Sequence, residues 1–63
     1  MKDKIEVYYV AAGRDRWYWR RRAPNGRIVA TAHEGYRTRT TVARAVARER
    51  AQFIIKPSVE WLY

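Results

Sequence analysis

The chain of 63 residues has no cysteine, and it contains a single histidine and a single serine. The lack of cysteine excludes disulfides and thiolate metal sites, and His33 alone offers no ligand set for zinc or iron. A catalytic histidine would need a nucleophile, whereas the only serine is Ser58, near the end of the chain. We therefore expect no metal, no cofactor, no small-molecule substrate and no enzymatic activity.

Glycine and long apolar runs are also scarce. The three glycines, Gly13, Gly26 and Gly35, are too far apart to form a phosphate-binding loop. The N-terminal segment has no apolar run of signal-peptide length, and eighteen apolar residues never occur together. We expect one soluble, cytoplasmic domain over residues 1–63. A core of this size supplies only ~3–5 kcal/mol, which favours self-association as an additional source of stability.

Positive charge dominates the composition, with 14 lysines and arginines against 6 acidic residues and a net charge of +8. Such a field attracts nucleic acid, an anionic membrane surface or an acidic protein. Eleven of the basic residues are arginine, which suits bidentate contacts with phosphates and bases, although a GC-rich genome would also enrich arginine and alanine.

The first half of the chain predicts a sheet over about residues 4–33. IEVYYV (5–10), RWYWRRR (16–22) and RIVATA (27–32) are rich in β-branched and aromatic residues or alternate as strands do. PNG at 24–26 is a strong hairpin turn, with Gly26 supplying a positive φ. The expected fold class is α+β: a three-stranded antiparallel meander packed on one C-terminal helix.

That helix is predicted at about 39–53, capped by Thr38, with an apolar stripe formed by Val42, Ala45, Val46 and Phe53. Because the apolar stripe is needed for the core, we rank membrane binding as the last of the possible functions. We expect solvated side chains for Arg44 and Arg48 on the outer face of the helix and for Arg37 near its start. Pro57 ends any continuation. The tail, 54–63, is too apolar for a solvated terminus, so we expect it to help hold a homodimer through Ile55, Val59, Trp61 and Leu62.

The series IEVY, RW, NG, IVAT and EGY, in this order between Ile5 and Ala51, resembles the YegP-like family of small bacterial proteins. The resemblance implies a ββ-β-α fold and pairing through the sheets into compact dimers, and it implies no activity. Within EGY, we expect Gly35 to adopt a positive φ and Tyr36 to pack over the helix start. Topology alone is also similar to plant AP2-type domains and phage integrase arm-binding domains, which lay a three-stranded sheet in the major groove.

Strand alternation sorts the arginine-rich second strand into two faces. The family resemblance implies that Trp17 and Trp19 meet the helix, which leaves Arg16, Tyr18, Arg20 and Arg22 on the exposed face. The first strand adds Tyr8 to this face, with Glu6 and Val10 as further candidates, and Arg14 and Arg27 lie at the hairpin ends. Arginines crowded around an aromatic ring are typical of a nucleic-acid surface, with double-stranded DNA favoured over RNA. The alternative is a homodimeric interaction module in which this face docks an acidic protein, or in which the arginine stems lie along aromatic rings.

Two charges are expected to point into the interface between sheet and helix. Arg21 alternates with Trp19, and Glu49 falls within the helix stripe, although the family has an aliphatic residue there. An unpaired charge in this position costs several kcal/mol. We therefore predict that Glu49 bonds an arginine of the second strand, Arg21 first and a neighbour at the interface edge second, and that this pair fixes the helix register.

Overall fold

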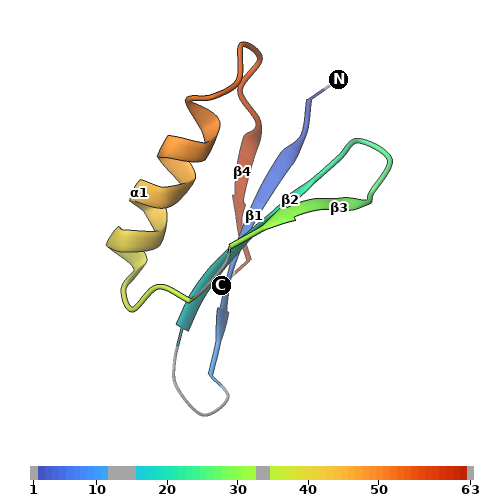
Figure 1. Cartoon of the computed structure of the whole chain (residues 1–63). Helices are drawn as coiled ribbons and strands as arrows, with labels where there is room; N and C mark the ends of the chain where they lie inside the picture. The colour runs from blue at the N-terminus through green and yellow to red at the C-terminus, as the bar shows by residue number, and fades with distance from the viewer. Residues whose placement is uncertain (1, 12–15, 33–34, 63) are drawn as a thin grey trace.

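The computed structural model describes residues 2–11, 16–32 and 35–62 and contains a four-stranded sheet with one helix on one face (Figure 1). The α+β class and the antiparallel β1-β2-β3 meander are confirmed. The prediction of three purely antiparallel strands is wrong, because the sheet has the order β3-β2-β1-β4 and β4 runs parallel to β1. The elements are β1 (Lys4–Val10), β2 (Arg16–Arg22), β3 (Ile28–Thr31), α1 (Arg39–Arg50) and β4 (Ser58–Trp61).

The strand β4 lies within the segment that was expected to be a tail. Val59 pairs in register with Ile5, and Trp61 pairs with Val7. Since side chains alternate along a strand, Val59 and Trp61 reach the helix side of the sheet, where both pack against the core. Two of the apolar residues in this segment, Val59 and Trp61, are thus partly buried against the core of their own chain.

The turn between β2 and β3 is confirmed as a tight hairpin. Gly26 adopts a φ of 91°, and its N–H donates to the carbonyl of Ala23 at 2.8 Å. The N–H of Arg27 donates to Oδ1 of Asn25 at 3.0 Å. Proline, asparagine and glycine at 24–26 therefore each have the role that their turn preferences predict.

The helix begins where it was predicted and ends earlier. Thr38 is the N-cap, and its hydroxyl accepts from the N–H of Thr41 at 3.1 Å. After Arg50 the pattern tightens, because Gln52 and Phe53 donate to carbonyls three residues back. The helix thus ends at Arg50, three residues before the approximate end that was predicted, and Phe53 lies beyond it instead of continuing its stripe.

The core lies between α1 and the inner face of the sheet. Its buried members are Ile5, Val7, Trp19, Val42, Ala45 and Val46, with Trp17 and Tyr36 among the half-buried residues around them. Trp17 and Trp61 meet edge to face, with ring centroids 6.1 Å apart. The assignment of both strand-two tryptophans to the helix side is confirmed.

The ion pair between Arg21 and Glu49 is also confirmed. Nε of Arg21 lies 3.5 Å from the Glu49 carboxylate, although no hydrogen bond to the described residues involves this nitrogen. The guanidinium donates instead through NH1 to Asp3 and lies over the ring of Phe53, 4.9 Å from its centroid. Two carboxylates and an aromatic ring therefore compensate this arginine at the edge of the core.

Candidate nucleic-acid interface

The face of the sheet opposite α1 carries the alternate side chains of β1 and β2. We call this surface the open face. Glu6 pairs with Arg20, and Tyr8 pairs with Tyr18, so these four side chains lie on it. The strand-two arginines Arg20 and Arg22 are therefore on the face where they were predicted. In Figure 1 the helix lies on the other side of the sheet. From these two strands the open face comprises Lys4, Glu6, Tyr8, Val10, Arg16, Tyr18, Arg20 and Arg22.

The sheet narrows toward the 10–16 end of the β1-β2 hairpin. β4 pairs with β1 only as far as Val7, and β3 pairs with β2 only from Arg20 onward. The remaining residues, 8–10 and 16–18, pair mainly with each other, and Tyr36 bridges Trp17 from one side. We call this part the β1-β2 ribbon.

Aromatic side chains cover the ribbon. On the open face, the rings of Tyr8 and Tyr18 stack with centroids 5.7 Å apart and an interplanar angle of 20°. The guanidinium of Arg20 lies over Tyr8, 4.8 Å from the ring centroid. On the inner face, Tyr9 and Trp17 are 5.1 Å apart. These cross-strand pairs stiffen the ribbon and hold Arg20 beside it.

Arg16 is held at the ribbon by a close approach to Gly35. A Cβ added at Gly35 would lie 2.6 Å from the Cβ of Arg16 and 2.7 Å from its next two side-chain carbons. Glycine is therefore needed at this position for space. The prediction of a positive φ at Gly35 is wrong, since Gly26 is the one glycine with positive φ among the described residues.

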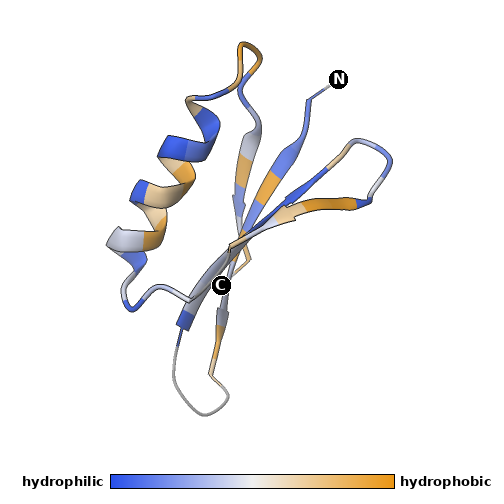
Figure 2. Cartoon of the chain, viewed as in Figure 1, coloured by the Kyte–Doolittle hydropathy of each residue, from blue (hydrophilic) through white to orange (hydrophobic). Residues whose placement is uncertain are grey.

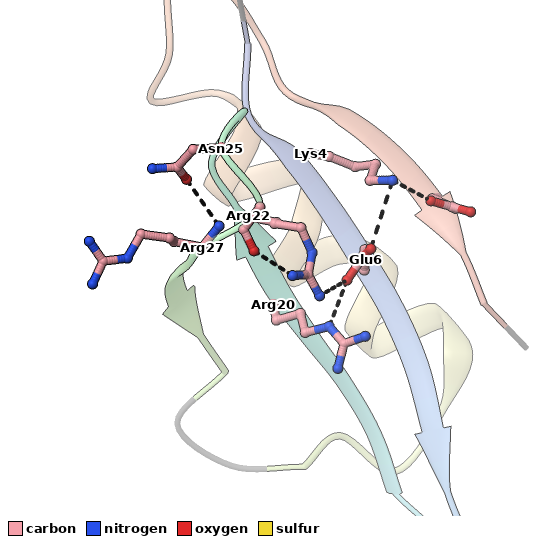
Figure 3. Close-up of polar contacts among 8 residues, drawn as sticks. Lys4, Glu6, Arg20, Arg22, Asn25 and Arg27 are labelled. Carbon is pink, nitrogen blue, oxygen red and sulfur yellow. Dashed lines mark hydrogen bonds and ion pairs between the residues drawn. The ribbon is translucent and has the colours of Figure 1, made fainter.

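Glu6 is the centre of a charge cluster on the open face (Figure 3). Its carboxylate, 7% exposed as a residue, accepts from Nε of Arg20 at 2.7 Å and from NH2 of Arg22 at 3.2 Å. Nζ of Lys4 lies 3.8 Å away. The hydrogen bond from Arg20 is the main reason that the pKa of Glu6 is lowered. The carboxylate of Glu6 thus offsets the repulsion between the neighbouring guanidiniums of Arg20 and Arg22.

The predicted arginines differ in whether they take part in this cluster: Arg20 and Arg22 do, and Arg27 does not. Arg22 is held at both ends of its guanidinium, because NH1 also donates to the carbonyl of Gly26 at 2.5 Å. Arg27 is exposed at the hairpin turn and extends away from the cluster (Figure 3). At about 3.3 Å per residue, Arg16 and Arg22 lie about 20 Å apart along β2, so the predicted set is a strip along the strand. Arg14 lies outside the described residues.

The four residues expected to hold a dimer lie in different surroundings. Val59 and Trp61 pack on their own core, and the guanidinium of Arg39 lies 4.5 Å from the centroid of the Trp61 ring system. Ile55 is exposed, and Leu62, also exposed, donates its N–H to the carbonyl of Val7 at 2.8 Å. They do not form one apolar patch, and dimerisation stays a prediction.

A second group of exposed apolar residues was missed by the sequence reasoning. Ile28 and Val29 on the edge strand β3 are 45% and 49% exposed. Figure 2 shows the apolar colour on β3 and again at the loop between α1 and β4. A register shift in β3 opposite Arg21 and Arg22 breaks the strand alternation, so the pattern IVAT could not indicate which side chains lie inside.

Neither a metal cluster nor a membrane span is found within the part of the chain that the structure describes. No group of three or more histidine, cysteine, aspartate or glutamate side chains is placed to hold an ion there. No helix in the same residues is long and apolar enough to cross a membrane. His33 and Glu34 lie outside these residues.

Residues 12–51 match the family described as a domain of unknown function (DUF1508). The match covers more than half of the chain, which therefore belongs to this family. The matched range contains β2, β3 and α1 and leaves the parallel pair β1 and β4 outside. Comparisons with curated proteins and with solved structures found no match.

Proposed function

We propose that this protein is a non-catalytic, cytoplasmic nucleic-acid-binding module whose β1-β2 ribbon contacts double-stranded DNA in preference to RNA. The observation that carries the proposal is the narrowing of the sheet to a ribbon with Arg16 and Tyr18 on its open face and Arg20 directly beside it. We further assign the chain to the YegP-like group of its family, on the series RW, NG and EGY.

The dimensions of the ribbon support duplex DNA. The major groove is about 12 Å wide and admits a two-stranded ribbon, whereas four strands spaced about 4.8 Å apart span about 14 Å before side chains are added. Only the part beyond β3 and β4 is therefore narrow enough to enter. In this arrangement, Arg16 contacts phosphates or guanine edges and the ring of Tyr18 packs on sugar or base. Arg20, in the four-stranded part beside the ribbon, contacts phosphates at the rim of the groove.

The charge cluster around Glu6 limits which arginine nitrogens are left to contact DNA. Nε of Arg20 is engaged by Glu6, and the hydrogen bonds found among the described residues leave its NH1 and NH2 for a ligand. Arg22 instead connects Glu6 to the turn carbonyl of Gly26. We therefore assign Arg22 to positioning the hairpin.

A salt titration of duplex binding tests this proposal. The slope of log K against log salt is about −0.9 per phosphate contact, so Arg16→Gln with Arg20→Gln is expected to reduce the slope by about 1.8. Arg16→Gln alone, which breaks no ion pair found among the described residues, is expected to reduce it by about 0.9. Lys2→Gln with Lys56→Gln makes the same change in net charge at exposed positions away from the ribbon and serves as the control.

Two outcomes would contradict the proposal. One is an absence of duplex binding by the wild-type chain at low salt. The other is an equal loss of slope in the arginine double variant and in the lysine control, which would reduce the interaction to net charge alone. Circular dichroism of each variant verifies that the fold is retained.

The exposed edge of β3 favours a second candidate, a homodimeric protein-interaction module. Ile28 and Val29 present apolar side chains beside an edge that pairs with no other strand of the sheet order. Sedimentation equilibrium with Val29→Lys tests it, since an edge-to-edge dimer would dissociate. Deleting residues 57–63 is not a suitable test, because it removes β4 and the buried Pro57 and so disrupts the fold itself.

A further inference from the structure

The carboxylates of the described residues are all engaged by cations on the sheet. Glu6 contacts Arg20 and Arg22, Glu60 contacts Lys4, and both Asp3 and Glu49 contact Arg21. Glu49 belongs to α1, yet its side chain pairs with a strand residue. The net charge is +8, so the chain has more cations than these carboxylates can pair. Two of the remaining cations, Arg44 and Arg48, lie on the outer face of α1.

Arg44 and Arg48 are exposed one helical turn apart on that outer face. The positions three and four residues from each are threonine, alanine, glutamine or the other arginine, so no carboxylate lies at helical pairing distance. Two like charges at this spacing repel each other and destabilise the helix. Arg48 lies in the last turn, where the helix dipole favours a cation, but Arg44 lies in the middle of the helix and gains little from it.

Small side chains beside these arginines leave an open hollow of about 490 Å³, lined by Thr41, Arg44, Ala47 and Arg48. Two guanidiniums at the sides of a hollow with a hydroxyl group can donate to phosphate oxygens from several directions. The charge of the hollow is complementary to a polyanion.

We propose that the outer face of α1 is a second phosphate-binding surface, and that it takes the backbone of a second DNA duplex while the ribbon holds the first. The helix and the open face lie on opposite sides of the sheet (Figure 1), so one duplex can occupy each side. The protein thereby bridges two duplexes. Bridging rests on the proposed function for its first duplex, whereas phosphate binding by the helix does not.

The test mixes two short duplexes, one carrying a donor and one an acceptor fluorophore, and measures energy transfer as the protein is added. The wild-type chain is expected to bring the two labels together. Arg44→Gln with Arg48→Gln is expected to abolish transfer while single-duplex affinity, measured by anisotropy, falls by less than about threefold. Lys2→Gln with Lys56→Gln, with the same change in charge, is expected to retain transfer.

Further measurements distinguish DNA binding by the helix from DNA binding by the ribbon. Transfer that persists in Arg44→Gln with Arg48→Gln would overturn the proposal. If the ribbon variant Arg16→Gln binds a single duplex as well as wild type while the helix variant does not, the proposed function fails and the helix site stands. Sedimentation equilibrium must show the same oligomeric state in all variants. Binding to phosphatidylserine-containing vesicles that is lost in Arg44→Gln with Arg48→Gln, together with no energy transfer between duplexes, would assign the outer face of α1 to a membrane. That result would overturn the proposal.

Discussion

Replacing Glu6 with glutamine removes the negative charge at the centre of the open face and keeps the shape of the side chain. Glu6 accepts from Arg20 and Arg22, and the side chains of these arginines are each 32% exposed. The variant therefore leaves two guanidiniums close together without the carboxylate between them. We expect lower stability together with tighter DNA binding, because both arginines are released and the net charge rises by one.

The magnitude follows from the two hydrogen bonds. A hydrogen bond to a charged group contributes about 1.5–3 kcal/mol when it is buried. Water reaches both arginines, and glutamine retains one acceptor oxygen. The free energy of unfolding is therefore expected to fall by about 2 kcal/mol, which is less than the sum of two buried hydrogen bonds. In a domain of this size, that lowers Tm by about 10–15 °C.

The pH dependence of this loss identifies its electrostatic origin. The pKa of Glu6 is lowered in the folded protein, so as the pH falls below about 4.5 the unfolded chain takes up the proton first, and stability decreases. Below the folded pKa the wild-type side chain is protonated and resembles glutamine. Urea denaturation at several pH values should show a wild-type advantage above pH 5 that vanishes in acid. An advantage that is unchanged at pH 2.5, or absent at pH 7, would refute the reasoning.

Glu60→Gln is the matched control on the same face. Glu60 pairs with Lys4 at 2.9 Å, but their side chains are 48% and 44% exposed, so little change in Tm is expected. The hydrogen bond from Lys4 to Glu60 raises the pKa of the lysine above its ordinary 10.5, so any stabilisation by this pair is present at neutral pH and is lost as the pH rises through the raised value.

Four further substitutions test packing, turn geometry and capping by chemical denaturation. Trp61→Ala should cost about 2–3 kcal/mol, since it removes the ring that meets Trp17; a cost near zero would mean that β4 does not contribute to the core. Gly35→Ala should cost about 1–3 kcal/mol by displacing Arg16, and should also weaken DNA binding, whereas Gly26→Ala should destabilise through its φ of 91° alone. Thr38→Ala should cost about 1 kcal/mol and lower helicity, and unchanged helicity would argue against the cap.

Local signals were sufficient to predict the meander, the turn and the helix start. Pro24, Asn25 and Gly26 identify the hairpin, and Thr38 identifies the cap, because each of these residues acts on its own backbone or on close neighbours. The pairing of Arg21 with Glu49 could also be predicted, since strand alternation and helix periodicity together place both charges at one interface.

Non-local pairing could not be predicted from those signals. β4 pairs with β1 across more than fifty residues of chain, and the only indication in the sequence is the alternation of Val59 and Trp61 with polar residues over a run of four. Four residues are too few to distinguish a strand from an apolar tail. The role of Glu6 likewise depends on register, because it becomes the partner of Arg20 only when the two strands align.

The most direct test of DNA binding by the ribbon is a titration of the isotope-labelled protein with a short duplex, followed by amide and arginine side-chain chemical shifts. The largest changes are expected at Tyr8, Arg16, Tyr18 and Arg20, with Arg22 and the core residue Val42 little affected. Shifts confined to α1, to the β3 edge, or distributed evenly over the exposed lysines and arginines would contradict DNA binding by the ribbon.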